Sequence, residues 1–336
     1  MIGVIGAGAM GAAMTVQLMR AGNDVWIFTT PFDAPFVDAH RRGEPHPGLG
    51  VPLPPLTTFV EPDVWADALP KVDRVVLAVA TAGLVETVRA AAPHVPGDAL
   101  WIVATKGWDE EGVRPASGLV VDEIGDRSRV VAVVGPSIAA EVAHGVPTAV
   151  VCASESAHAA RHVAEMFDSP FFRTYTSTDV TGVEVGAIMK NIVAIAVGMC
   201  DGLCEAFGVP AMTNAKAFVF SRGLVEMAKL AVALGGRSET ILGLAGAGDL
   251  FVTALAGRNG KYGKLIGEGR SPEDALEEMH TTVEGYVNAR AATLLAHRHG
   301  LELPLVHTVA NVLFYGLPPR EAVERLVSPP AEEELT

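Results

Sequence analysis

Three glycines near the N-terminus, Gly6, Gly8 and Gly11, have the types and spacing of a phosphate-binding loop. The G-x-G-x-x-G pattern follows an apolar run that predicts a buried strand, and it opens a segment with helical periodicity. In that context the first glycine permits a tight turn, the second lets the backbone approach a pyrophosphate, and the third allows close helix–strand packing. The helix N-terminus supplies free N–H donors to the anion. The pattern predicts a dinucleotide-binding loop formed by Gly6, Gly8, Ala9, Met10 and Gly11; the alternative is a glycine-rich turn without a ligand.

The residues after the second predicted strand do not distinguish NAD from NADP. An NAD site usually has Asp or Glu there to bind the ribose hydroxyls, and an NADP site has a nearby Arg. Here that place holds Thr29 and Thr30, Asp33 comes a little later, and Arg41 and Arg42 are more distant. We therefore expect NAD or NADP as cofactor, with the preference undecided.

Strands and helices alternate through the first half of the chain. Apolar runs predict strands at residues 1–5, 25–28, 75–79, 100–103 and 130–134, with helical stretches between them. Closely spaced prolines predict a long irregular loop over residues 31–55. Strands that are apolar on both faces are typical of a parallel sheet covered by helices on each side. We expect an α/β fold in which residues 1–178 form a Rossmann domain with a doubly wound parallel sheet.

The second half of the chain is predicted to be helical. Long segments with helical patterning cover residues 180–200, 215–234, 271–279, 284–299 and 305–314, and glycine-rich or proline-containing breaks join them. We expect an all-α C-terminal domain over residues 179–336 that carries the substrate and catalytic groups.

Two short segments place polar groups where ligands could bind. Gly135 and Ser137 follow the strand that ends at Val134, at the carboxyl edge where doubly wound sheets bind ligands, although Ser137 could simply cap a helix. Asp249 and Thr253 are spaced i, i+4 and would share one face of a helix. The alternative for Asp249 is a helix cap after the preceding glycine-rich stretch.

Several longer segments resemble the NAD(P)-dependent glycerol-3-phosphate dehydrogenase family. They are Lys106-Gly107, residues 135–142 with 145–149, residues 189–198, residues 243–250 followed by Thr253 and Arg258-Asn259, and residues 283–285. They occur in the family's order over nearly the whole chain. The resemblance implies reversible, NAD(P)H-dependent reduction of dihydroxyacetone phosphate to sn-glycerol 3-phosphate, which feeds glycerophospholipid synthesis.

The resemblance also implies catalytic roles for Lys190, Asp249, Thr253 and Lys106. Lys190 would be the proton donor to the ketone oxygen, and Asp249 and Thr253 would orient it and bind the substrate. A lysine exchanges protons near neutral pH only if burial or other cations lower its pKa, and the apolar helix predicted around Lys190 would provide burial. Lys106 would be a second nearby cation. The alternative for Lys190 is a side chain that extends out of an interior helix.

The remaining site residues follow from the same resemblance. The guanidinium of Arg258 would donate two parallel hydrogen bonds to the substrate phosphate, and the amide of Asn259 would donate another. The complete substrate set implied is Lys106, Gly135, Ser137, Lys190, Asn191, Asp249, Arg258 and Asn259. Beyond the glycine loop, the cofactor set implied is Lys106, Ala139, Arg258 and Glu284. The family is commonly dimeric, so a homodimer is expected.

The sequence departs from the family pattern at several positions. Residues 203–213 contain an apparent insertion of about half a dozen residues, which we expect beside the active site. Gly257 stands where the family usually has Ser before Arg-Asn, and Met10 and Ala12 replace the usual aromatic residue and Thr. The insertion and Gly257 keep open a dehydrogenase of a different small phosphorylated or anionic ketone or hydroxy acid. A nonenzymatic dinucleotide sensor is the other alternative, but it would not need a proton donor.

Composition excludes several other classes of function. The 336 residues carry 25 basic and 39 acidic side chains, a net charge of −14, and no basic run, so neither nucleic acid nor a membrane surface is an expected partner. The three cysteines lack a C-x-x-C spacing, which favours a reducing, cytoplasmic location. Residues 1–19 lack the basic start of a signal peptide. His158 and His162 lack the Glu of a zinc protease motif, so no metal is expected.

Overall fold

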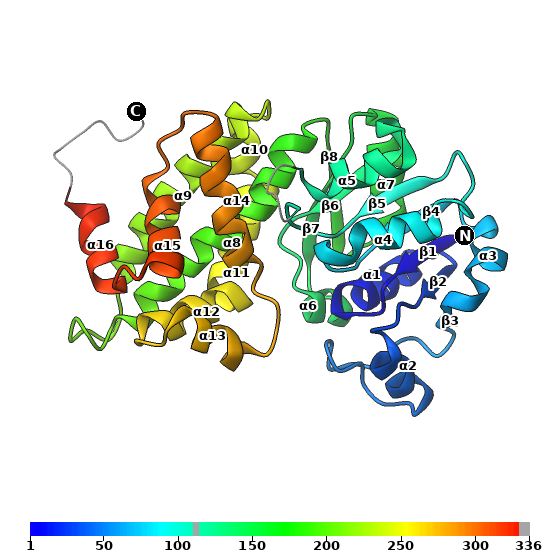
Figure 1. Ribbon diagram of the computed structural model, residues 1–336. Coiled ribbons are helices and arrows are strands. Elements are labelled where there is room, and N and C mark those ends of the chain that lie inside the picture. The colour runs from blue at the N-terminus through cyan, green and yellow to red at the C-terminus, as the bar shows by residue number, and fades with distance from the viewer. Residues whose placement is uncertain (110–113, 329–336) are drawn as a thin grey trace. The chain divides into compact units, whose positions relative to one another are not determined.

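Eight strands form one sheet in the first part of the chain, in the order β3-β2-β1-β4-β5-β6-β7-β8 (Figure 1). The computed structural model describes residues 1–109 and 114–328, and its contacts divide the chain into two units, with the division after Val180. The strands are β1 (Ile2–Ile5), β2 (Val25–Phe28), β3 (Thr58–Val60), β4 (Arg74–Leu77), β5 (Leu100–Val103), β6 (Val130–Val134), β7 (Thr148–Ala153) and β8 (Phe172–Ser177). The order of the first six is that of a dinucleotide-binding sheet. The predicted α/β fold is thus confirmed.

One strand pair breaks the predicted parallel pattern. All neighbouring strands are parallel except β6 and β7, which are antiparallel. The five strands predicted from the sequence pair with one another in parallel, as expected. The strand β7 was not among them, and an apolar run that is buried on both faces does not reveal the direction of such a neighbour.

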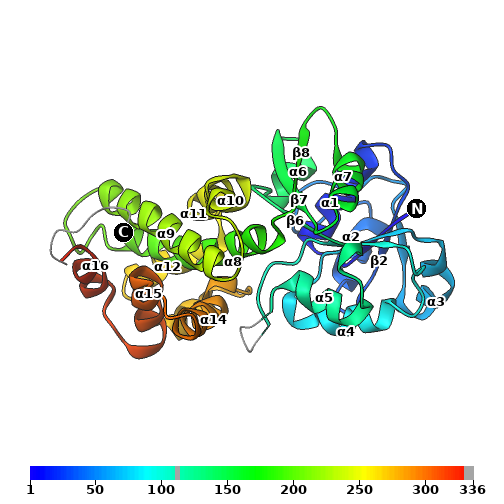
Figure 2. The ribbon, with the colours of Figure 1, turned by 90° about the horizontal axis from the view of Figure 1, so that it is seen from above.

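Helices cover both faces of this sheet, and Figure 2 shows α1 and α7 on the side opposite α4 and α5. The helices are α1 (Ala9–Arg20), α2 (Ala34–Arg41), α3 (Trp65–Ala68), α4 (Thr81–Ala91), α5 (Ala116–Ile124), α6 (Ala139–His144) and α7 (Ala157–Phe167). Successive strand residues alternate between two cores: Val76 and Ile102 pack with α1 and α7, whereas Leu77 and Trp101 pack with α4 and α5. Both faces of the central strands are therefore buried, as the apolar runs require.

The predicted irregular loop over residues 31–55 is wrong where α2 lies. Pro35 stands in the first turn of α2, a position that tolerates proline because the missing N–H would have no intrahelical acceptor. A proline in such a stretch predicts a break in a helix, whereas Pro35 lies within the first turn of one.

The second unit, as described through residue 328, is helical. Its elements are α8 (Val180–Gly202), α9 (Thr213–Ala233), α10 (Ser238–Leu242), the π-helical turn η4 (Leu244–Gly248), α11 (Asp249–Ala256), α12 (Arg258–Gly267), α13 (Pro272–Met279), α14 (Glu284–Arg298), α15 (Pro304–Tyr315) and α16 (Pro319–Val327). Residues 329–336 of the predicted helical domain lie outside the described residues. By length and composition α8 could cross a membrane, but its apolar window is completely buried within the protein, as expected of a core helix.

Glycines set the close packing of α12 on α8. A Cβ at Gly198 of α8 would lie 2.0 Å from the carbonyl oxygen of Gly260, and one at Gly263 of α12 would lie 2.0 Å from that of Ile195. No larger residue fits at these positions. This packing fixes α12, whose first two residues are Arg258 and Asn259, against the central helix.

Candidate functional site

The glycine loop between β1 and α1 has the shape that a pyrophosphate requires. Gly6 has a φ of +101°, and a Cβ at Gly11 would lie 2.0 Å from the Gly6 carbonyl oxygen, so both positions demand glycine. A Cβ at Gly8 would meet no heavy atom within 4 Å, which leaves open space beside the N-terminus of α1. No side chain caps that helix N-terminus. These features fit a bound dinucleotide, whose phosphates would accept from the uncapped N–H groups.

Two other predicted segments lie at the same carboxyl edge of the sheet. Lys106 follows β5, and the Thr81 hydroxyl donates to its carbonyl oxygen at 3.1 Å. Gly135 follows β6, and the Ser137 hydroxyl donates to its carbonyl oxygen at 3.0 Å. Ser137 does not cap α6, since the N-cap residue is Ile138, which leaves the Ser137 oxygen as an acceptor near the start of α6 at Ala139.

The residues that follow β2 form hydrogen bonds with two nearby carboxylates, those of Asp33 and Glu61. The Thr30 N–H and hydroxyl donate to Oδ2 of Asp33 at 2.7 and 2.8 Å. The Thr29 hydroxyl donates to Oε2 of Glu61 at 2.9 Å, and Arg41 lies 3.4 Å from Oε1 of the same carboxylate. Glu61 and Arg41 would favour opposite nucleotides, so the end of β2 offers a group suited to NAD and one suited to NADP. Glu61 lies far from the glycine loop in the chain, so the loop pattern does not point to it.

In the second unit, Lys190 and Asp249 form a buried ion pair. Nζ of Lys190 on α8 lies 2.5 Å from Oδ1 of Asp249, the first residue of α11, and both side chains are buried. Gly186 makes this approach possible, because a Cβ there would lie 2.6 Å from the Ala245 carbonyl oxygen in the π-helical turn. Such π turns often occur at functional sites. Asp249 is not the cap considered for it, because Gly248 occupies the N-cap position.

Thr253 lies one helical turn after Asp249. Its hydroxyl donates to the Asp249 backbone carbonyl oxygen at 2.7 Å, and the residue is buried. The hydroxyl hydrogen is therefore used within α11, and the oxygen keeps lone pairs with which it can accept a further hydrogen bond.

Asn191, Asn259 and Glu284 form a second polar cluster in this unit. The Asn259 amide donates to Oδ1 of Asn191 at 2.9 Å, and the Asn191 amide donates to Oε2 of Glu284 at 3.0 Å. Oδ1 of Asn259 accepts from the N–H of Gly285 at 2.9 Å. Arg258 lies 4.0 Å from Oε1 of Glu284 and is about half exposed. The predicted residues Asn191, Arg258, Asn259 and Glu284 are thus brought together, with Arg258 the most accessible.

The insertion lies away from Lys190 along α8. Residues 203–213 begin where α8 ends at Gly202, about 18 Å from Lys190 at a rise of 1.5 Å per residue. Arg320 of α16 stacks on the Phe207 ring at 4.8 Å and donates to the Ala206 carbonyl oxygen at 3.4 Å. The expectation that this segment lies beside the active site was wrong for the groups around Lys190, because α8 continues well past that residue.

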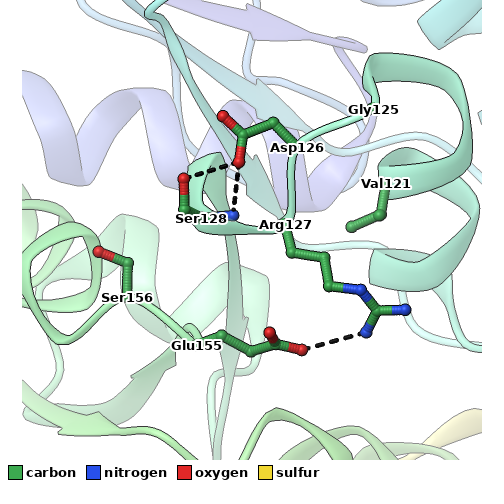
Figure 3. A pocket seen from close by; sticks show the side chains of 7 residues that line it. All are labelled: Val121, Gly125, Asp126, Arg127, Ser128, Glu155 and Ser156. Atoms are coloured by element: carbon green, nitrogen blue, oxygen red, sulfur yellow. Dashed lines mark hydrogen bonds and ion pairs between the residues drawn. The ribbon is translucent and has the colours of Figure 1, made fainter.

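A surface hollow in the first unit lies at the other edge of the sheet (Figure 3). It surrounds the turn before β6, where Arg127 pairs with Glu155 at 3.1 Å and Asp126 accepts from the N–H and hydroxyl of Ser128. Gly135 follows the opposite end of β6. The hollow is therefore separate from the glycine-loop edge, and Arg127, Glu155, Asp126 and Ser128 within it are already engaged in these contacts.

No group of three or more His, Cys, Asp or Glu side chains in the described part of the chain could hold a metal ion. Within the same residues all three cysteines are free thiols, and burial raises the pKa of Cys152 to about 12 and that of Cys200 to about 11. Neither thiol is activated for nucleophilic chemistry.

Comparison with known proteins gives consistent matches over both units. The family described as NAD-dependent glycerol-3-phosphate dehydrogenase matches with its N-terminal part at residues 1–160 and its C-terminal part at residues 179–324. The NAD(P)+ glycerol-3-phosphate dehydrogenase of Symbiobacterium thermophilum is 38% identical over 337 residues, covering 99% of this chain and 95% of that protein. The NADP(+)-dependent glycerol-3-phosphate dehydrogenase of Archaeoglobus fulgidus is 34% identical over 334 residues, covering 97% of this chain and 99% of that protein.

A solved structure has the same arrangement of elements. The glycerol-3-phosphate dehydrogenase of Coxiella burnetii superimposes with a TM-score of 0.86 at 31% identity, covering 98% of each chain.

Proposed function

Because the chain belongs to the NAD-dependent glycerol-3-phosphate dehydrogenase family, we propose that it reduces dihydroxyacetone phosphate to sn-glycerol 3-phosphate, reversibly, with NADH or NADPH. The observation that carries this proposal is the buried pair of Lys190 and Asp249, on a helical unit that matches the family's C-terminal part. A buried ammonium beside a carboxylate is a proton donor of fixed position, which ketone reduction requires.

The reaction adds a hydride to the ketone carbon and a proton to its oxygen. A bound reduced nicotinamide supplies the hydride. Nζ of Lys190 donates the proton, and in the reverse direction the same atom accepts it from the alcohol. Asp249 holds Nζ in place at 2.5 Å, and the oxygen of Thr253 is available to accept a hydrogen bond from substrate. Lys106 is proposed as a second cation that binds substrate and cofactor.

The substrate phosphate is proposed to bind Arg258 and Asn259. Arg258 is exposed enough to meet an anion, and its planar guanidinium matches two phosphate oxygens. Asn259 is positioned by its bonds to Asn191 and Gly285, and its amide has a second hydrogen for an acceptor. Asn191, Gly135 and Ser137 complete the proposed substrate contacts.

The cofactor is proposed to bind the glycine loop through Gly6, Gly8, Ala9, Met10 and Gly11. Ala139 at the start of α6 and Glu284 at the start of α14, together with Lys106 and Arg258, are the further proposed contacts. We propose residues 1–178 as the cofactor domain and residues 179–336 as the catalytic domain.

A spectrophotometric assay tests the function directly. The purified protein is mixed with NADH or NADPH and one of several small ketones, and oxidation is followed at the nicotinamide absorbance. Dihydroxyacetone phosphate is expected to give the highest kcat/KM, and the two nucleotides together establish the cofactor preference. Faster turnover of another phosphorylated or carboxylated ketone would contradict the substrate while keeping the reaction type.

The departure at Gly257 follows from packing and does not favour that second candidate, a dehydrogenase of a different small anionic ketone. A Cβ at Gly257 would lie 2.4 Å from the Thr253 carbonyl oxygen, so the serine that the family pattern usually has there does not fit. The insertion no longer supports this candidate, since it lies far along α8 from Lys190.

In the cell, the proposed product feeds glycerophospholipid synthesis. We propose a cytoplasmic homodimer, in keeping with the family, the low cysteine content and the acidic composition.

A further inference from the structure

A buried histidine contacts the glycine loop from a segment far away in the sequence. His46 is 2% exposed, and its Nε2 lies 2.8 Å from the carbonyl oxygen of Ala7, which stands between the first two glycines of the loop. His46 belongs to the connection between α2 and β3. The reaction proposed above gives it no chemical role.

The two partners of His46 determine its tautomer. The N–H of Gly48 donates to Nδ1 at 3.1 Å, and this group can only donate. Nδ1 is therefore the acceptor nitrogen, and in the neutral ring the hydrogen is on Nε2. That hydrogen is donated to the Ala7 carbonyl oxygen, which can only accept.

The segment around His46 is a closed turn that packs on the loop. Residues 46–51, here called the histidine turn, are held by the His46 N–H donating to Val51 and by the N–H groups of Leu49 and Gly50 donating to the His46 carbonyl oxygen, at 2.8 to 2.9 Å. The His46 ring stacks on Phe36 of α2 with centroids 4.8 Å apart. A Cβ at Gly48 would lie 2.8 Å from Cβ of Ala9, the first residue of α1.

The contact with Ala7 has a consequence for the next residue. The chain has no cis peptide bond in its described part, and a planar trans peptide directs its C=O and N–H in opposite directions. Holding the Ala7 carbonyl oxygen toward the histidine turn thus directs the Gly8 N–H away from it. Accepting a hydrogen bond at the C=O also polarises the N–H of the same peptide group.

We infer that His46 is a positioning residue for the dinucleotide, which it serves by orienting the Gly8 N–H toward the pyrophosphate. This inference rests on the proposed cofactor site, and it assigns to the histidine turn a role in nucleotide affinity rather than in proton transfer.

Two amide substitutions distinguish a role of His46 in orienting the Gly8 N–H from a role only within the histidine turn. In His46→Gln the amide nitrogen can take the place of Nε2 and donate to Ala7. In His46→Asn the shorter amide can replace only Nδ1, so it accepts from Gly48 but does not reach Ala7. The readout is the Kd of NADH, NADPH and ADP-ribose, measured by calorimetry without substrate, together with kcat at saturating nucleotide.

The expected result is a rise in Kd of about tenfold for all three ligands in His46→Asn, the scale of one lost hydrogen bond, with kcat nearly unchanged. His46→Gln should bind within about threefold of the parent protein. His40→Asn is the matched control, because His40 lies on α2 against Phe59 and should leave every Kd unchanged. Should His46→Asn not fold, His46→Phe replaces it, since it keeps the ring stacked on Phe36 and loses the donor.

The inference is overturned if His46→Asn binds as the parent does while His46→Gln binds weakly, since the histidine would then act only within its own turn. Parent-like binding by both variants, or by His46→Phe in place of Asn, also overturns it. Because ADP-ribose binding needs no ketone, the result is independent of whether dihydroxyacetone phosphate is the substrate.

Discussion

Lys190 and Asp249 are paired at 2.5 Å, with 6% and 2% of their side chains exposed. Burying a charge without a partner is costly, so the pairing lets both side chains lie in a place with little water. The pair also holds Nζ of Lys190 beside the first turn of α11. Catalysis and stability are therefore linked at this site, and substitutions must be designed to separate the two.

Lys190→Ala is expected to lower kcat by roughly two to four decades, the usual scale of lost acid–base catalysis, and to leave the Kd of NADH or NADPH nearly unchanged. Because this variant leaves Asp249 buried without Lys190, the double variant Lys190→Ala/Asp249→Ala is the control for folding. Turnover and nucleotide binding are measured for both. An equal loss of nucleotide affinity and turnover in both variants would show that Lys190 is structural.

Arg258→Ala is expected to raise the KM of dihydroxyacetone phosphate by a factor corresponding to about 1.5–3 kcal/mol, the contribution of a hydrogen bond to a charged group. Unphosphorylated dihydroxyacetone, a poorer substrate, should change little because it has no group for the guanidinium to bind. Lys261→Ala, an exposed cation on the same helix α12, is the control for a general change of charge. If both ketones weakened equally, the phosphate assignment to Arg258 would be wrong.

Much of the helical unit could be predicted because its apolar periodicity and the residues that begin and end helices indicate the same segments. The segment predicted at residues 284–299 is observed as Glu284–Arg298, and that at 271–279 as Pro272–Met279. The strands at 25–28, 100–103 and 130–134 were predicted at the same bounds. Each of these elements is determined mainly by residues close in sequence.

The contacts between distant segments could not be predicted in the same way. The hydrogen bond between Asn191 and Asn259 depends on the glycines that let α8 and α12 approach, and a glycine within a helix gives no indication of its partner. His46 and Ala7 are in contact although α1, β2 and α2 lie between them in the sequence. A lone histidine in a proline-rich stretch resembles an ordinary loop residue, so its sequence gives no sign of this contact. The π-helical turn before Asp249 has no distinct sequence period.

Glu226 is expected to make the stability of the helical unit depend on pH. Its carboxylate, buried on α9, accepts from the N–H groups of Leu305 and Val306 at the start of α15, and burial raises its pKa from 4.5 to about 7. An acid with a raised pKa in the folded state favours folding most when protonated. Its contribution is therefore present below about pH 4.5 and is lost as the pH rises through 7.

Because of Glu226, the free energy of unfolding of the parent protein should fall by up to about 3 kcal/mol as the pH rises from about 4.5 to about 7. Glu226→Gln should remove that slope and lose one hydrogen bond to α15. Urea unfolding at several pH values, with the exposed Glu165→Gln as control, measures both effects. A slope that is the same in parent and Glu226→Gln would contradict the assignment.

Deletion of residues 204–210 tests whether the insertion controls the substrate site. Because this segment begins about 18 Å along α8 from Lys190, kcat and KM should stay within about twofold of the parent values. Removing Phe207 forfeits its contact with Arg320, so a modest loss of stability on the order of 0.5–1 kcal/mol is expected. Arg320→Ala removes the same contact without shortening the chain and should show the same loss. A changed KM or substrate ranking in the deletion alone would instead identify the segment as a lid, and a smaller particle by light scattering would identify it as a subunit contact.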